Sequence, residues 1–131
     1  MLKIKKDVYD RILETARSGL PNETCGYLAG KDNLITLCYP LTNMDHSPDH
    51  YSFDPEEQFE AMKDARRKGL DIIANFHSHP ETPARPSGED IKLAYDPNII
   101  YGIVSMKSGT EILNFFRIKE KKVTLIEYSI V

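Results

Sequence analysis

Residues 72–80 read Ile-Ile-Ala-Asn-Phe-His-Ser-His-Pro, an apolar run that ends in two histidines and a proline. Its apolar first half is typical of a buried strand, because a short apolar run bounded by turn residues favours a strand over a helix. Successive side chains of a strand point to opposite faces of a sheet. His77 and His79 are therefore expected on one face at the end of a strand over 70–79, where sheets expose reactive groups beside loops.

A second polar stretch, Ser87-Gly88-Glu89-Asp90, places a carboxylate eleven residues after His79. Two neutral imidazoles and one carboxylate are three ligands of the kind that hold a catalytic zinc, with water in the fourth position. Two simpler interpretations stay open. The histidines could be a surface pair at a strand end, and Ser-x-x-Asp before an apolar run is also a capping box. The cap accounts for Ser87 and Asp90 but leaves the histidines unexplained.

Helix signals flank this central stretch. Asp7 predicts the cap of a helix over about 8–17. Asp54-Pro55 predicts the start of another helix, which runs to about residue 68, because proline suits the first helical position. Phe59, Met62 and Ala65 are expected to face inward from that helix. Ser87 predicts a short helix to about residue 95.

Strand patterns fill most of the remaining chain. Strands are predicted over residues 1–6, 25–30, 33–39, 70–79, 99–105, 111–118 and 123–130. Helices and strands interleave early and a meander follows late, so we expect one mixed sheet with helices packed on it. The length of 131 residues fits a single domain over 1–131.

Composition and charge exclude several classes of protein. The chain is 40% hydrophobic and 28% charged with a net charge of -3, which argues against a general nucleic-acid binder. No apolar run approaches the roughly 20 residues of a membrane span, and the first residues lack the pattern of a signal peptide. Cys25 and Cys38 match neither a disulfide framework nor a zinc ribbon. These features predict a cytoplasmic protein with reduced thiols.

Other polar side chains are also candidates for a functional site. Glu23 lies in a loop and carries no spacing signal of its own, but water activated by a metal needs a nearby carboxylate to take its proton. Asp45, His46, Asp49 and His50 form a cluster that we interpret as a solvated loop, since no ligand spacing matches it. Cys25 is interpreted as a buried apolar thiol rather than a nucleophile.

Taken together, these segments resemble the JAMM motif of MPN-domain zinc metallopeptidases, and in particular the small stand-alone prokaryotic type. The family pattern is H-x-H-P, a short loop and S-x-x-D, with a glutamate far upstream near a first core strand. His77–Pro80, Ser87–Asp90 and the segment Glu23-Thr24-Cys25-Gly26-Tyr27-Leu28 match it in order. Asn43, Ser47-Pro48, Tyr51 and Asp54-Pro55 also resemble the connecting segment of small bacterial members.

The resemblance implies a cytidine-deaminase-like α/β fold, a curved mixed β-sheet flanked by α-helices. It implies that His77, His79 and Asp90 bind one Zn²⁺ per chain, with water as the fourth ligand. Glu23 would deprotonate that water and pass the proton to the leaving amine. Ser87 would donate a hydrogen bond to the oxyanion.

The same resemblance implies hydrolysis of a peptide or isopeptide bond at the C-terminus of a ubiquitin-like or sulfur-carrier protein, with release of cysteine or another adduct. That carrier would be the partner, bound by its tail as an added strand. Two alternatives stay open: a non-catalytic MPN scaffold, whose members usually lose metal ligands, and a zinc amidase acting on a small molecule. A deaminase is disfavoured because its H-x-E and P-C-x-x-C signature is absent.

Overall fold

The computed structural model describes residues 1–131, apart from the side chain of Ser108. The helices are α1 (Lys6–Gly19), α2 (Pro55–Arg67) and α3 (Gly88–Lys92), with a short 3₁₀ turn at Lys107–Gly109. The strands are β1 (Leu2–Ile4), β2 (Cys25–Lys31), β3 (Leu34–Leu41), β4 (Asp71–His79), β5 (Ile100–Ser105), β6 (Ile112–Lys119), β7 (Lys122–Ile126) and β8 (Tyr128–Ile130).

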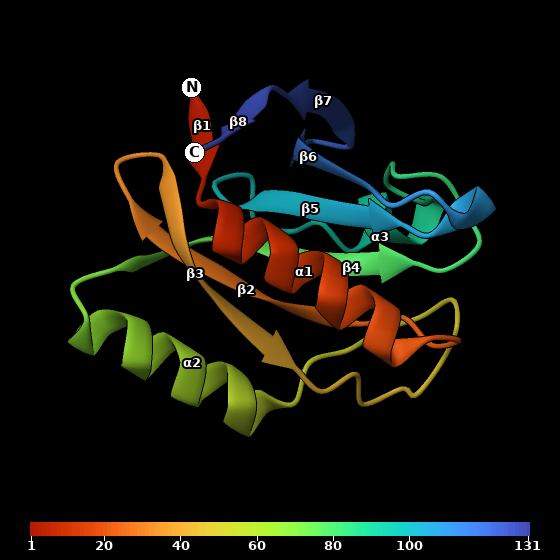
Figure 1. The fold of residues 1–131 in the computed structure, drawn as a ribbon, viewed down its shortest axis with the longest axis horizontal. Coiled ribbons are helices and arrows are strands. Elements are labelled where there is room, and N and C mark those ends of the chain that lie inside the picture. Colours follow the sequence, from red (N-terminus) through yellow and green to blue (C-terminus); the bar gives the residue numbers. More distant parts are fainter.

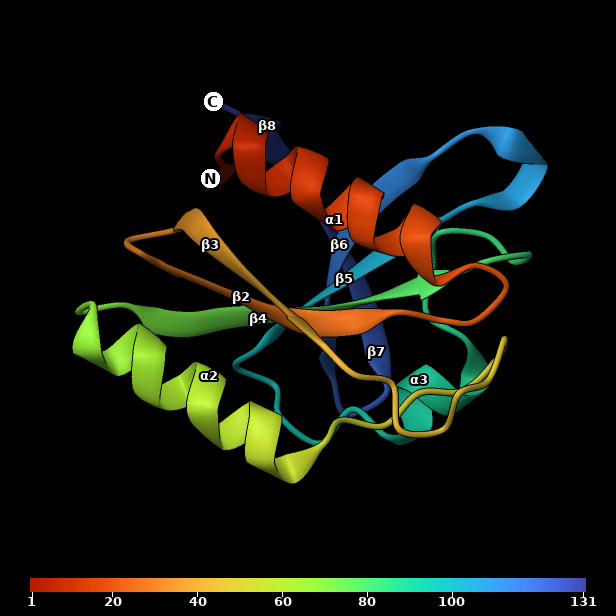
Figure 2. The same ribbon diagram turned by 60° about the horizontal axis from the view of Figure 1, so that its bottom comes forward.

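All of these strands belong to one curved sheet in the order β7-β6-β5-β4-β2-β3-β1-β8 (Figure 1). The sheet is mixed: β4 runs antiparallel to β2 and parallel to β5. It is flanked by α1 on one face and α2 on the other (Figure 2). The expected fold class, a curved mixed sheet between helices, is confirmed.

The hydrophobic core lies between α1 and the sheet. Val8, Ile12 and Ala16 are buried at helical spacing and join a cluster that includes Phe76 and Phe115. Gly26 allows a close approach in this layer. A Cβ atom added there would lie 2.5 Å from the Phe76 ring and 2.4 Å from the carbonyl oxygen of Tyr39.

The central strand β4 divides its side chains between the two faces of the sheet. Ala74 and Phe76 belong to the cluster packed on α1, while His77 and His79 point to the opposite face. Because β4 and β5 are parallel, the chain must cross over between them. The crossover carries α3 and places it beside the end of β4, on the face of the two histidines (Figure 2).

The predicted cap of α1 and the predicted inward face of α2 were wrong. Asp7 does not cap α1: it lies in the first turn, and Lys5 occupies the cap position without a side-chain hydrogen bond. Phe59 and Met62 are 60% and 48% exposed, because α2 packs on the sheet through Ala61 and Ala65, whose small side chains allow a close approach.

The predicted strand over 123–130 is two strands. β7 pairs with β6 at one end of the sheet, and β8 pairs with β1 at the other end. The chain crosses between the two ends at Glu127, so the curved sheet is nearly closed (Figure 1).

Candidate metal centre

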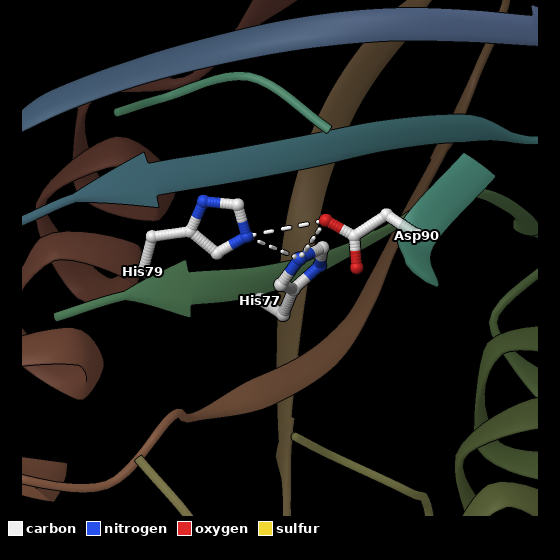
Figure 3. Close-up of side chains that lie close together, drawn as sticks. All are labelled: His77, His79 and Asp90. Carbon is white, nitrogen blue, oxygen red and sulfur yellow. Dashed lines mark hydrogen bonds and ion pairs between the residues drawn. The ribbon is translucent and has the colours of Figure 1, made fainter. Parts of the chain in front are cut away.

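His77, His79 and Asp90 meet at the carboxyl end of β4 (Figure 3). The Nε2 atoms of the two histidines are 3.1 Å apart, and Oδ2 of Asp90 lies 3.1 Å from Nε2 of His77 and 3.2 Å from Nε2 of His79. Three ligands of a tetrahedral zinc with bonds of about 2.0–2.1 Å are separated by roughly 3.3 Å, so the triangle has the dimensions of a zinc site. Among the described residues, these three form the only such group.

The tautomer of His79 suits metal binding. Its Nδ1 atom lies 2.8 Å from the carbonyl oxygen of Pro83, which can only accept a hydrogen bond. Nδ1 therefore carries the proton in the neutral ring, and Nε2 keeps its lone pair facing Asp90 and His77. A hydrogen bond of this kind orients metal-ligating histidines in proteins. The carbonyl comes from the loop after β4, which is held by hydrogen bonds from Ser105 to Thr82 and from Asn114 to Ala84.

His77 is held mainly by packing. Its ring stacks on Tyr51 with centroids 4.5 Å apart and an interplanar angle of 22°. Its Nδ1 atom is buried without a hydrogen-bond partner among the described residues. Burial lowers the pKa of His77 despite the nearby Asp90 carboxylate, which favours the neutral ring that a metal requires.

Asp90 is fixed by the first turn of α3. Its backbone N–H donates to Oγ of Ser87 at 3.0 Å, and its Oδ2 accepts from the backbone N–H of Ser87 at 2.8 Å, which completes the capping box. Burial alone would raise the pKa of Asp90. The close imidazole rings of His77 and His79 outweigh burial and hold that pKa well below its usual range. The hydrogen bonds that cap α3 thus also hold the Asp90 carboxylate beside the two histidines.

Glu23 lies in the loop before β2 and is 7% exposed. Burial raises its pKa to about 7, although the nearby His79 acts in the opposite direction. His79 and Asp90 are among the charged groups that lie close enough to influence this pKa. A carboxyl with a pKa near 7 can both accept and release a proton at neutral pH.

The backbone beside Glu23 is tied to β4 between the two histidines. Oγ of Ser78 accepts hydrogen bonds from the backbone N–H of Thr24 at 2.8 Å and from its hydroxyl at 3.1 Å. The backbone N–H of Ser78 in turn donates to the carbonyl oxygen of Thr24. Sequence reasoning did not single out Ser78. Its position between two ligands, with its side chain on the opposite face, was the available signal.

Asn43 also ties the backbone at Glu23 to another part of the chain. Its side-chain nitrogen donates to the carbonyl oxygens of Glu23 and His50, and its side-chain oxygen accepts from the backbone N–H groups of Asp45 and Ser52. One buried amide therefore holds the loop over 43–53 against the segment that carries Glu23. The sequence pointed to Asn43 only through the family resemblance.

The remaining candidates contribute no site of their own. The loop histidine His50 contacts Glu89 at 2.9 Å, while Asp45 and Asp49 contact Ser52 and Ser47. Cys25 and Cys38 are free and buried. Burial, and after it the neighbouring Glu23, raises the pKa of Cys25 to about 12, so this thiol is not a nucleophile at neutral pH.

A cleft of 390 Å³ adjoins the triangle on the side of His77. The side chains that line it are largely aromatic and apolar, and they include Tyr27, Tyr51, Tyr95, Tyr101 and Ile118. Glu23 and His79 do not line it. None of the helices in the described chain combines the length and apolar composition needed to cross a membrane.

The sequence from residue 5 to residue 119 matches the family model described as prokaryotic homologs of the JAB domain. The chain belongs to this family. The resemblance stated from the motifs is therefore confirmed at the level of the family.

Named relatives include peptidases. The chain is 37% identical over 112 residues to the CysO-cysteine peptidase of Mycobacterium bovis, a match that covers 82% of this chain and 75% of that protein. It is 35% identical over 85 residues to the desampylase of Pyrococcus furiosus, covering 65% of this chain and 61% of that protein. The second match thus spans less than two thirds of the archaeal enzyme.

Solved structures share the fold. A solution structure of a Desulfitobacterium hafniense protein has a TM-score of 0.91 and 42% identity, and the match covers 100% of this chain and 93% of that one. A JAB1/MPN domain protein from Archaeoglobus fulgidus has a TM-score of 0.70 at 23% identity, covering 99% of each chain, and shows the fold alone.

Proposed function

We propose that this JAB-family chain is a zinc-dependent peptidase that hydrolyses the amide bond at the C-terminal glycine of a ubiquitin-like or sulfur-carrier protein. The observation that carries the proposal is the triangle of His77 Nε2, His79 Nε2 and Asp90 Oδ2, beside a glutamate whose pKa is raised to about 7. Two imidazole nitrogens and one carboxylate oxygen fit zinc and leave a position open for chemistry.

The three ligand atoms would hold the ion at the end of β4. When bound, zinc would supply Lewis-acid activation of the attacking water and of the scissile carbonyl. The protein's own residues would do the rest. The bond from His79 Nδ1 to Pro83 and the stacking of Tyr51 on His77 keep both rings turned toward the site.

Glu23 would move the proton. In its ionised form it takes a proton from the attacking water, and in its protonated form it delivers that proton to the leaving nitrogen. A pKa of about 7 keeps both forms accessible at neutral pH. The hydrogen bonds of Ser78 and Asn43 to the neighbouring backbone would fix where this carboxyl lies.

Ser87 would stabilise the oxyanion. Its Oγ atom accepts from the backbone N–H of Asp90, so its hydroxyl proton is left to donate to the substrate. One such donor contributes about 2.7–4 kcal/mol to lowering the barrier in well-studied hydrolases.

The names of the relatives support the substrate class. One is a CysO-cysteine peptidase and another a desampylase. The alternatives are a non-catalytic scaffold and a zinc amidase for small molecules. A scaffold needs neither the ligand triangle nor a raised pKa at Glu23, and both are present.

The test is hydrolysis of a carrier conjugate by zinc-loaded protein, followed by intact mass. We expect close to one zinc per chain and the mass of the free carrier from a carrier–cysteine or carrier–lysine conjugate. Glu23→Gln should keep the zinc and lose about 10²–10⁴-fold in rate. A loaded protein that cleaves small amides but no conjugate would support the amidase, and one that cleaves neither would support the scaffold.

A further inference from the structure

A second hollow, of 400 Å³, lies outside the cleft, between the end of α3 and the turn that joins β6 to β7. Lys92, Tyr95, Ile118, Lys119 and Lys121 are among the residues that line it. We call these five residues the lysine hollow.

The lysine hollow adjoins the cleft. Tyr95 and Ile118 line both, so a chain that leaves the cleft on this side would lie close to the lysines. Glu23 does not line the cleft. Because Glu23 must reach the leaving amine, the cleft is expected to hold the acyl side of the substrate.

The net charge of residues 117–122 is opposite in sign to that of the whole chain. The net charge is -3, yet residues 117–122 carry Arg117, Lys119, Lys121 and Lys122 against the single acid Glu120. None of the ion pairs among the described side chains involves Lys92, Lys119 or Lys121. These ammonium groups are exposed and available to a partner's carboxylates.

Apolar side chains are also present on the hairpin formed by β6 and β7. Val123 and Leu125 of β7 pair with Ile118 and Phe116 of β6, so they share the face of Ile118. Leu125 is 61% exposed and Tyr95 is 81% exposed. Exposed aromatic and aliphatic groups with charges around them are the composition of a protein-binding surface, with an apolar centre and a polar rim.

We propose that the lysine hollow, with Val123 and Leu125, docks the folded body of the protein whose C-terminal tail occupies the cleft, and that the docked face carries aspartate or glutamate around an apolar contact. The inference rests on the proposed function for the identity of that protein. A short tail ends within the cleft, whereas the body upstream of the tail must lie outside it, where the two hollows meet.

The direct test is binding, which needs no hydrolysis. The probe is a diglycine-terminated ubiquitin-like sulfur carrier from the organism that makes this chain. Lys119→Glu/Lys121→Glu is expected to raise its Kd about 3- to 30-fold, as expected for rim charges. The matched control, Lys3→Glu/Lys5→Glu, makes the same charge change in β1 and just before α1, at residues that line neither the cleft nor the lysine hollow, and should leave the Kd within about twofold.

The salt dependence of carrier binding should further distinguish the wild type from Lys119→Glu/Lys121→Glu. Raising ionic strength should weaken carrier binding to wild type and control, and weaken it far less for Lys119→Glu/Lys121→Glu. Equal Kd values for wild type and the double variant, including no binding by either, would overturn the docking proposal. Self-association of wild type in sedimentation, lost in the double variant without any effect on the carrier, would assign the surface to a second copy instead.

Hydrolysis then distinguishes this proposal from the proposed function. If wild type cleaves a short diglycine-amide peptide and the double variant loses rate on the protein conjugate alone, both proposals stand. If the double variant loses equally on peptide and conjugate, its lysines do not act by docking. If wild type cleaves neither substrate while the carrier still binds in a lysine-dependent way, the peptidase proposal fails and the docking surface remains.

Discussion

The side chains on the two faces of β4 are buried to a similar extent, but burial has a different role on each face. Phe76, on the face toward α1, is fully buried within an apolar cluster. His77 and His79, on the opposite face, are 2% and 4% exposed and hydrogen-bond to a carboxylate and a carbonyl. Burial contributes to the free energy of unfolding on the first face. On the second it sets pKa values and keeps rings in place, so adjacent residues of one strand should respond to mutation in separable ways.

The sharpest separation is expected from His79→Ala. The substitution removes one ligand atom and the hydrogen bond to Pro83, so zinc content should fall from near one per chain to near zero and hydrolysis to the uncatalysed level. The metal-free fold should lose no more than about 2 kcal/mol, since the α1 core is untouched. Metal analysis, the conjugate assay and urea unfolding measure the three quantities. Retained zinc and activity would remove His79 from the site.

Phe76→Ala should act in the opposite way. Truncating this fully buried ring should lower the free energy of unfolding by about 3–5 kcal/mol, because it leaves a cavity against α1 and the glycines beneath it. Urea unfolding measures the loss. Phe59→Ala is the control, because it makes the same substitution at a 60% exposed position. It should change the free energy of unfolding by no more than about 0.5 kcal/mol. Equal losses at the two positions would contradict the placement of the core.

Ser87→Ala tests the residue that serves both structure and chemistry. We expect kcat to fall about 10²–10³-fold through loss of an oxyanion donor. Loss of the cap should cost a further 0.5–2 kcal/mol, roughly, of stability. Ser87→Thr keeps a hydroxyl and a cap, and should recover much of both. A variant that loses stability but keeps its kcat would show that Ser87 acts as a cap alone.

The smallest effect is a pH dependence of stability in the metal-free protein. Burial raises the pKa of Glu23 from its ordinary value of 4.5 to about 7 in the folded state, so between these pH values the folded state binds more protons than the unfolded one. Its contribution to stability is therefore present below about pH 4.5 and declines as pH rises toward 7. Comparing wild type with Glu23→Gln in urea at several pH values isolates this contribution. A difference that stays constant from pH 4.5 to 8 would contradict the raised pKa.

Much of the site was predictable because its signals are local. The alternation of β4 placed His77 and His79 on one face, and the cap at Ser87 fixed the start of α3. Glu23 was different: no spacing links it to residues more than fifty positions away, and it was identified through the need for a base and through the family resemblance. Its role, like those of the other site residues, stays a prediction until the variants are measured.

The failures of sequence reasoning share one cause. Helical periodicity alone cannot decide whether α2 packs through Phe59 and Met62 or through Ala61 and Ala65, because the choice depends on how closely the sheet approaches. The split of the last strand depends on the curvature that brings β1 within reach of β8. Ser78 and Asn43 were underrated because their partners lie elsewhere in the chain.

The contact between His79 and Pro83 has an evolutionary consequence. The group that orients the ring is a main-chain oxygen, which every amino acid possesses. The loop over 81–86 can therefore exchange its side chains during divergence and keep its effect on His79, provided that its path is preserved. Homologues could differ at position 83 while retaining the same support, and loop grafts that copy the backbone should transfer it more faithfully than grafts that copy single residues.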